Sequence, residues 1–465
     1  MAFTRNDTGG VGNLLGRVSR GAMWVTVMNV FTKVTAVIVT IIVLHKLSLY
    51  EYGFVELVLT VFSTWSIFSL SGFLNVVLAD VSSEIGRGDM PKAKGIFLSF
   101  VRAQTLLCLV GFLLLFFGSS LIASWYNPFI ASFIRIVSLI FLISPVRAFI
   151  YLMFSVSLSF RKLSLIGFFE ELGKLGFVLF FFYSTTLLAE GLVYSIVLSQ
   201  YVSALLLFPA AASEYGLFRK VSASKFNFLS LVFAHGKWSL FSDYLGKLSQ
   251  NLRFWIIKFF LGTEAVAVVA LAQGVIGNLA SFAPIPTLIA PLVARYISDA
   301  RRLTQLVVSS IKYQLITLFF ISAAAVVALP YLFAWFFPHY LPALSLVFLM
   351  LPVFLPVAAA SVLTSVFSAH KAQRSFFFSI VFKTVLIGIF LPLSIKIFGI
   401  SGVALEYFMT SAVSALERFS TMSRKFLREF NLRSIFTFDE IDRQIFTAAR
   451  MRVRRLNPVS SAQES

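Results

Sequence analysis

The sequence has 465 residues, of which 58% are hydrophobic and only 13% are charged. A soluble fold cannot hide so much apolar surface, so the composition predicts an integral membrane protein and excludes secreted, fibrous and disordered classes. The 39 Lys and Arg residues against 20 Asp and Glu residues give a net charge of +19. In a membrane protein such an excess indicates orientation signals, an anionic cargo or both. The single cysteine, Cys108, excludes an internal disulfide and a cysteine-based metal site.

The apolar runs are continuous rather than alternating, which predicts membrane-spanning helices of about 20 residues each and argues against a barrel of strands. The first six helices are expected near residues 21–44, 54–80, 96–122, 131–155, 165–188 and 191–212. Six more are expected near 237–261, 264–294, 306–335, 341–368, 376–397 and 401–421. We therefore expect an all-α polytopic membrane protein with about twelve transmembrane helices.

The charges in the connecting segments alternate along the chain. One set of connections carries sixteen basic residues: Arg5, Arg17, Arg20, Arg87, Lys92, Lys94, Arg161, Lys162, Arg219, Lys220, Lys225, Arg295, Arg301, Arg302, Lys371 and Arg374. The other set carries only Lys46 and Lys396. By the positive-inside rule, both termini are expected in the cytoplasm, with an even number of crossings.

The second half of the sequence resembles the first when it is shifted by 209 to 214 residues. Trp24 and Lys33 fall on Trp238 and Lys247, and further matches include Asp89 with Asp299, Gln104 with Gln314 and Lys174 with Lys383. Such a repeat predicts two pseudo-symmetric six-helix bundles, related by an axis along the membrane normal, around a central cavity. The expected divisions are an N-terminal lobe at 1–212, a cytoplasmic linker at 213–230, a C-terminal lobe at 231–421 and a basic cytoplasmic tail at 422–465.

Several cations lie within the expected spans, where each costs about 2.5 to 3.5 kcal/mol on insertion scales. Lys33, Lys247 and Arg147 lie near mid-helix, and Lys174 and Lys383 lie between the middle and an end. Together with Asn29 and Asn251 they are our candidate substrate-binding residues, because a cavity with excess positive charge favours a cargo that carries phosphate. The alternative is that a carboxylate one turn earlier neutralises the cation, Asp243 for Lys247 and Glu170 or Glu171 for Lys174.

Acidic residues within the spans are rarer. Asp243 and Glu56 are candidates for binding a coupling proton or sodium ion. We expect no other cofactor, no metal site and no catalytic residue. The short external connections carry no acid and base cluster, and no phosphate-binding Gly-x-x-x-x-Gly-Lys-Ser/Thr motif occurs, so an enzyme is not expected.

Three stretches carry a family resemblance: Leu47-Ser48-Leu49-Tyr50-Glu51-Tyr52-Gly53 after the first span, the end of the second span near Gly72, and Arg87-Gly88-Asp89. With the twelve-helix plan, they make the chain similar to the polysaccharide-unit flippases of the multidrug/oligosaccharidyl-lipid/polysaccharide (MOP) exporter superfamily. The resemblance implies movement of an undecaprenyl-pyrophosphate-linked oligosaccharide, such as an O-antigen or capsule unit, across a bacterial inner membrane. It also implies a cation-lined central cavity, for which Lys33, Arg147, Lys174, Lys247 and Lys383 are the candidates.

The partners expected on this reading are the lipid-linked oligosaccharide, membrane lipids, and a polysaccharide polymerase with chain-length proteins, and not nucleic acid. Two alternatives stay open within the same architecture. One is a cation-coupled multidrug exporter, which predicts a cavity dominated by acidic residues. The other is a flippase for a lipid-linked peptidoglycan precursor, whose known members usually carry two additional helices.

Overall fold

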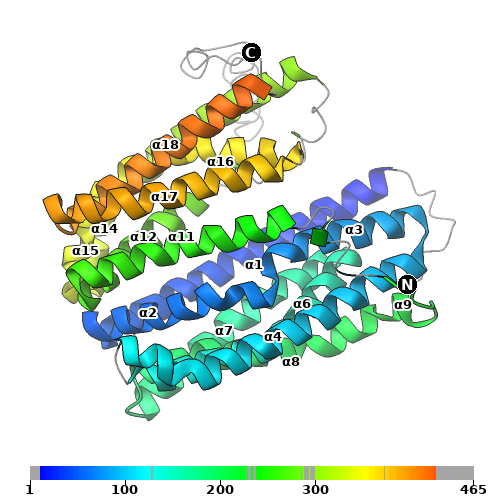
Figure 1. Ribbon diagram of the computed structural model, residues 1–465, viewed down its shortest axis with the longest axis horizontal. Coiled ribbons are helices and arrows are strands. Elements are labelled where there is room, and N and C mark those ends of the chain that lie inside the picture. Colours follow the sequence, from blue (N-terminus) through cyan, green and yellow to red (C-terminus); the bar gives the residue numbers. More distant parts are fainter. Residues whose placement is uncertain are drawn as a thin grey trace, which may run out of the picture. The chain divides into compact units, whose positions relative to one another are not determined.

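The computed structural model describes residues 11–126, 129–226, 228, 232–233, 237–283, 285–286, 293, 299–370 and 372–425. All regular secondary structure in these residues is helical (Figure 1). The first half contains α1 (Val11–Lys46), α2 (Leu49–Trp65), α3 (Leu74–Arg87), α4 (Met90–Tyr126), α5 (Ile130–Ser138), α6 (Ile140–Val156), α7 (Phe160–Ser184), α8 (Ala189–Glu214) and α9 (Gly216–Arg219). The second half contains α11 (Lys237–Leu261), α12 (Thr263–Ser281), α14 (Ala300–Phe336), α15 (Leu341–Met350), α16 (Phe354–Ala369), α17 (Gln373–Phe398) and α18 (Ser401–Lys425).

Nine helical segments within the described residues are long and apolar enough to cross a membrane. They are Val27–Lys46, Leu49–Ser69, Met90–Ser124, Ile130–Val156, Ala189–Glu214, Thr263–Ser281, Arg301–Phe336, Pro338–Phe367 and Gln373–Phe398. The other three predicted spans coincide with α7, α11 and α18, which have 25 residues each and carry more charge. At 1.5 Å per residue each is about 37 Å long, enough for a hydrocarbon core of about 30 Å. The all-helical, multi-pass prediction is therefore confirmed, while residues 426–465 of the predicted tail lie outside the described part of the chain.

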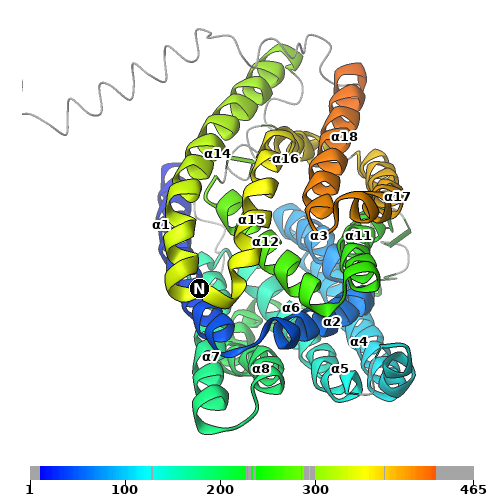
Figure 2. The same cartoon turned by 90° about the vertical axis from the view of Figure 1, so that its left-hand side faces the viewer.

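Contacts divide the chain into two compact units. The first comprises Met1–Leu271, Leu332–Ala343 and Ile387–Ile400, and the second comprises Ala272–Tyr331, Leu344–Leu386 and Ser401–Ser465. In the first unit α7 packs against α1 and α8, α4 packs against α5 and α6, and α11 packs against α2 (Figures 1 and 2). In the second unit α16 packs against α18. The lobe boundaries expected from the repeat stay a prediction.

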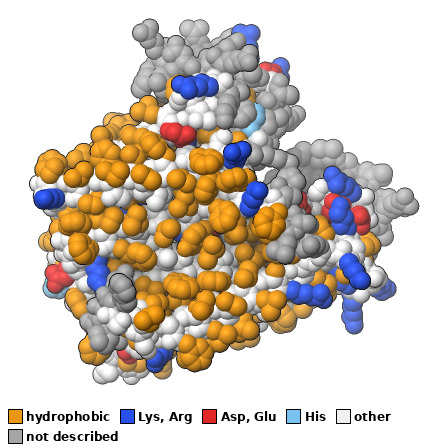
Figure 3. Space-filling view, in the orientation of Figure 1, with side chains coloured by type: hydrophobic (Ala, Val, Ile, Leu, Met, Phe, Trp, Pro, Cys, Tyr) orange, Lys and Arg blue, Asp and Glu red, His pale blue; other side chains and the backbone are white. Residues whose placement is uncertain are grey.

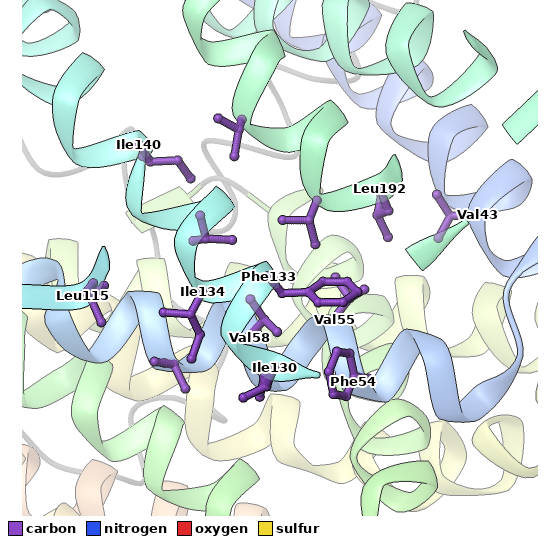
Figure 4. Packing of buried hydrophobic residues seen from close by; sticks show 14 of the residues in the cluster. Val43, Phe54, Val55, Val58, Leu115, Ile130, Phe133, Ile134, Ile140 and Leu192 are labelled. Atoms are coloured by element: carbon purple, nitrogen blue, oxygen red, sulfur yellow. The ribbon is translucent and has the colours of Figure 1, made fainter. Parts of the chain in front are cut away.

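The core of the first unit is apolar and joins helices that are far apart in the sequence. Figure 4 shows Val43 of α1, Val55 of α2, Leu115 of α4 and Leu192 of α8 among the buried side chains. The rings of Phe54 and Phe133 meet edge to face at 4.9 Å between centroids, a geometry that aromatic pairs prefer. Burying these side chains fixes how α1, α2, α4, α5 and α8 pack on one another.

The surface carries large apolar side chains in quantity. Phe117 of α4, Phe259 of α11, and Phe319 and Trp335 of α14 are all at least 70% exposed. Hydrophobic side chains cover most of the face in Figure 3. A soluble protein rarely exposes so much contiguous apolar surface, and contact with lipid tails explains it.

The second predicted span is not one helix. After Trp65 the chain forms two 3-10 turns, η1 (Ser66–Ser69) and η2 (Ser71–Phe73), with Leu70 between them in the left-handed conformation at φ 50°. The side-chain amide of Gln104 on α4 donates a 2.7 Å hydrogen bond to the Ser69 carbonyl. Because no water satisfies freed backbone groups in the hydrocarbon layer, such side-chain partners make a broken helix tolerable there.

The repeat predicted from the sequence reappears as matched structure within each unit. Helices α4 and α14 both have 37 residues and begin 210 positions apart. Asp89 and Asp299 each accept a hydrogen bond from the backbone N–H three residues later, at 3.0 and 3.1 Å. Gln314 donates to the Ala283 carbonyl at 3.0 Å, directly after α12, just as Gln104 does at the break after α2. The two halves therefore share their helix lengths and their local hydrogen bonds.

Candidate functional site

Helix α11 meets the broken second span through an ion pair. The Lys247 ammonium lies 2.9 Å from the Asp243 carboxylate, one turn earlier on α11. The ammonium also donates a 2.6 Å hydrogen bond to the Ser71 hydroxyl, which in turn donates to Asp243 at 3.3 Å. The Cα of Gly72 lies so close to Asp243 that a Cβ there would overlap the aspartate side chain. The ion pair thus docks α11 on η2.

A second ion pair lies within the N-terminal helices. The Arg147 guanidinium, near the middle of α6, contacts the Glu170 carboxylate of α7 at 2.6 Å. Its other terminal nitrogen donates a hydrogen bond to the Gln200 side-chain carbonyl on α8. The side chains of Arg147 and Glu170 are 30% and 24% exposed. Helices α7 and α8 therefore each supply a partner for the guanidinium of α6, and part of the arginine side chain stays exposed.

Lys174 belongs to the same group of residues. Its ammonium lies 3.5 Å from Glu171 of α7 and interacts electrostatically with Glu56 of α2. Tyr52, one turn earlier on α2, lies close enough to Glu56 for its hydroxyl to interact with the carboxylate. On α7 the charged residues lie opposite the exposed Leu172, Leu179 and Tyr183, as the helical period of 3.6 residues requires. The charges are thus turned away from the apolar outer face and towards α2, α6 and α8.

We name this set the α6–α7 ion group: Glu56, Arg147, Glu170, Glu171, Lys174 and their neutral partners Tyr52 and Gln200. It contains three carboxylates and two cations. The sequence predicts excess positive charge around the cargo, whereas this group, with every member ionised, carries one net negative charge. The predicted alternative of carboxylate partners is confirmed by the Lys247–Asp243 and Lys174–Glu171 pairs.

On α1, Asn29 is exposed and Lys33 is half-buried. With the exposed Thr40 they fall within about a 40° arc at 100° per residue. The exposed apolar residues Val30, Val34, Val37 and Ile38 follow a separate stripe. Helix α1 therefore has one apolar stripe suited to lipid and one polar stripe beside it.

The remaining two candidates lie elsewhere. Asn251 is only 5% exposed and donates a 2.9 Å hydrogen bond to the Thr64 hydroxyl of α2, so its amide is engaged in packing α11 on α2. Lys383 is half-buried on α17, in the second compact unit. The structure thus groups Arg147, Lys174 and Glu56 together and Asp243 with Lys247.

The Leu47-to-Gly53 stretch joins α1 to α2 and is held by close contacts. Ser48 and Glu51 form a capping box at the start of α2. The buried hydroxyl of Tyr340, in η4 (Pro338–Tyr340), donates to the carbonyls of Leu47 and Ser48 at 3.0 and 3.3 Å. A Cβ at Gly53 would overlap the carbonyl of Thr263. Close backbone packing therefore explains why this stretch has its residues in that order.

Sequence reasoning did not identify Ser71, Gln200 or Tyr52. Ser71 lies in Ser66-Ile67-Phe68-Ser69-Leu70-Ser71-Gly72, a cluster of small and polar residues within an apolar run. That cluster is the available signal for a broken helix. Gln200 gains its role only from the packing of α8 on α6, whereas Tyr52 lies one helical turn before Glu56 on α2.

The fold defines a polytopic helical membrane protein with partly exposed ion pairs among its helices. A comparison with solved structures finds the inward-facing conformation of a multidrug resistance MATE family transporter of the MOP superfamily, at TM-score 0.68 and 16% identity, covering 88% of this chain and 97% of that one. The lipid II flippase MurJ, in an inward closed conformation, matches at TM-score 0.68 and 12% identity, covering 89% of both chains. A MOP superfamily transporter from Pyrococcus furiosus matches at TM-score 0.64 and 15% identity, covering 89% of this chain and 96% of that one.

A family model described as polysaccharide biosynthesis protein matches residues 46–336. The chain belongs to this polysaccharide biosynthesis protein family and has the fold of the MOP superfamily. A search of curated sequences gave no match. Family and fold agree with the polytopic membrane protein that the sequence predicts.

Proposed function

We propose that the protein moves an undecaprenyl-pyrophosphate-linked oligosaccharide, an O-antigen or capsule repeat unit, across a bacterial inner membrane by alternating access. Membership of the polysaccharide biosynthesis protein family supports a glycan cargo. A sugar unit crosses the membrane more easily with its lipid attached, because the lipid stays in the bilayer while only the diphosphate and sugars need shelter.

The observation that carries the proposal is Arg147, a guanidinium near mid-helix that is held by Glu170 and Gln200 and remains 30% exposed. A planar guanidinium binds phosphate through two parallel hydrogen bonds, and it stays charged at any physiological pH. Lys174 and Lys247 add ammonium groups in neighbouring spans, and Lys33 and Lys383 are proposed to join them. Asp243 and Glu56 are proposed sites for a coupling proton or sodium ion.

The proposed topology places both termini in the cytoplasm, because the basic connections then face inward. The proposed partners are the lipid-linked substrate and, on the outer side, a polymerase with its chain-length proteins. A peptidoglycan precursor is the less favoured lipid-linked cargo. MurJ matches over 89% of its own chain, whereas the MATE family transporter matches over 97%, so more of MurJ has no counterpart here.

The test is a flipping assay in proteoliposomes. The probe is undecaprenyl pyrophosphate carrying one fluorescently labelled sugar, and an impermeant quencher reports how much probe has reached the outer leaflet. Arg147→Lys keeps the charge but loses the forked geometry, so we expect the flipping rate to fall about tenfold. Lys396→Ala, an exposed basic residue at the end of α17, is the control and should leave the rate unchanged. A wild-type rate equal to that of protein-free vesicles would overturn the proposal.

One observation favours a second candidate, a cation-coupled drug exporter. The α6–α7 ion group contains one more carboxylate than cations, and an acidic site is what a cationic drug requires. Drug susceptibility of a deletion strain separates the candidates. A drug exporter makes the strain more sensitive to cationic dyes while its surface glycan stays normal, whereas a flippase leads to loss of the glycan.

A further inference from the structure

The contacts of Arg147 are unusual for a residue that is meant to bind a cargo phosphate, because both ends of its guanidinium are already engaged. Glu170 is 2.6 Å from one terminal nitrogen, and Gln200 accepts from the other. Gln200 is neutral, but Glu170 is negatively charged, as a phosphate is, and contacts the arginine through one carboxylate oxygen. In this structure Glu170 therefore occupies the position at which a phosphate would bind the arginine.

We infer that Glu170 competes with the diphosphate of the cargo for Arg147. Glu170 pairs with Arg147 in the empty protein, is displaced by the diphosphate when the cargo binds, and pairs with Arg147 again when the cargo leaves. This inference rests on the proposed function. It assigns Glu170 a role as a positioning residue that acts through Arg147, which neither the family nor the fold assigns.

Chemistry favours such an exchange over a permanently open arginine. A guanidinium that is largely withdrawn from water is unfavourable without a partner, so the empty protein needs a counter-ion in place. A diphosphate carries more charge than one carboxylate and has oxygens enough to satisfy Arg147 and nearby ammonium groups together. Arg147 is then able to bind a phosphate in only a small fraction of the empty protein molecules. The apparent affinity of the protein for its cargo is reduced by that fraction.

The charges around Glu170 favour its release of Arg147. Glu171, the next residue on α7, interacts with it unfavourably, and the Lys174 ammonium lies within electrostatic range of the same carboxylate. When the cargo binds Arg147, Lys174, which pairs with Glu171 at 3.5 Å in the empty protein, is then shared by the two neighbouring carboxylates. Such a shift moves the Glu170 carboxylate from Arg147 of α6 towards Lys174 of α7.

The inference predicts opposite effects on binding and on turnover. Glu170→Gln keeps the size and a hydrogen-bond acceptor but removes the competing charge. We expect binding of farnesyl pyrophosphate, measured with the full-length protein in detergent, to tighten about tenfold. Flipping of the labelled undecaprenyl pyrophosphate probe should slow about tenfold at saturating probe, because nothing reclaims Arg147 on release. A purely structural role for Glu170 would weaken binding and slow flipping together.

A matched control is available on the same pair of helices. Lys162 of α7 and Glu214 of α8 also form an ion pair at 2.6 Å, with side chains 40% and 23% exposed, at the other end of α7 from Tyr183. Glu214→Gln removes an equally placed carboxylate that lies outside the α6–α7 ion group. Glu214→Gln should change neither the affinity nor the flipping rate. If loss of an ion pair between α7 and α8 impairs folding in general, this variant will show that effect as well.

Two more variants keep the inference open to refutation if Glu170→Gln folds poorly. Glu170→Asp keeps the charge but shortens the side chain, so affinity and flipping rate should lie between those of the wild type and of Glu170→Gln. The double variant Arg147→Gln with Glu170→Gln should lose the gain in affinity, because the gain acts through the arginine. Unchanged or weaker binding by both single variants, with normal wild-type binding and flipping, would overturn this inference alone. Wild-type protein that neither binds nor flips the probes would overturn the proposed function and this inference with it.

Discussion

The Lys247 ammonium on α11 donates a 2.6 Å hydrogen bond to the Ser71 hydroxyl, 176 residues earlier in the chain. Ser71 lies in the break of the second span, directly after the left-handed Leu70. Mid-membrane breaks that occur at matching places in two repeats are the features at which transporters of this kind bind and move their cargo. The contact between Lys247 and Ser71 therefore connects the Asp243–Lys247 ion pair of α11 to the part of the first unit where the helix geometry is irregular.

Gly72 sets how closely α11 approaches this break. Gly72→Ala would place a Cβ against Asp243, so α11 must shift or the ion pair must rearrange. Overpacking of this kind costs about 1 to 3 kcal/mol, and we expect a lower thermal midpoint and a reduced flipping rate. Gly86→Ala on α3 is the control, since a Cβ there meets nothing within 4 Å. Equal midpoints for the two variants would show that the approach at Gly72 is not tight.

The glutamines at the breaks provide a matched pair of tests. Gln104→Leu removes the donor to the Ser69 carbonyl, and Gln314→Leu removes the donor to the Ala283 carbonyl. A buried carbonyl without a partner costs about 1 to 3 kcal/mol, so both variants should lower thermal stability by similar amounts. Gln305→Leu, exposed on α14, should not. A large effect in one half and none in the other would argue that the two breaks are not equivalent.

The described residues of each predicted span are largely helical, although the second, fourth and tenth spans are each divided into shorter helices. A segment in lipid must satisfy its backbone internally, so apolar runs report helical structure directly. The break at Leu70 was not predicted, since it contains no proline and the Ser69 carbonyl before its left-handed residue accepts a hydrogen bond from Gln104 of another helix. Helical spacing predicted the Lys247–Asp243 and Lys174–Glu171 pairs. The Arg147–Glu170 pair joins residues 23 positions apart on separate helices, and only the packing of α6 on α7 brings them together.

The hydrogen bonds from Tyr340 to the start of α2 can be tested by their contribution to stability. Its hydroxyl is fully buried and donates to two carbonyls at the start of α2. Tyr340→Phe leaves the ring in place but removes the donor, so we expect a loss of about 1 kcal/mol in stability, measured as a shift in the thermal midpoint of the purified protein. Tyr331→Phe, where the side chain is 69% exposed, should have no effect. If both variants melt like the wild type, the Tyr340 hydrogen bonds contribute nothing measurable.

The single cysteine makes the proposed topology directly testable. Cys108 is 1% exposed, so the native chain should react little with maleimides and needs no prior cysteine removal. His339 and Ser222 are exposed and lie in connections assigned to opposite sides of the membrane. In intact cells with a permeabilised outer membrane, an impermeant maleimide should label His339→Cys and spare Ser222→Cys until the cells are lysed. The positive-inside rule places the connection with Arg219, Lys220 and Lys225 in the cytoplasm, so the opposite labelling pattern would reverse the orientation of the whole chain.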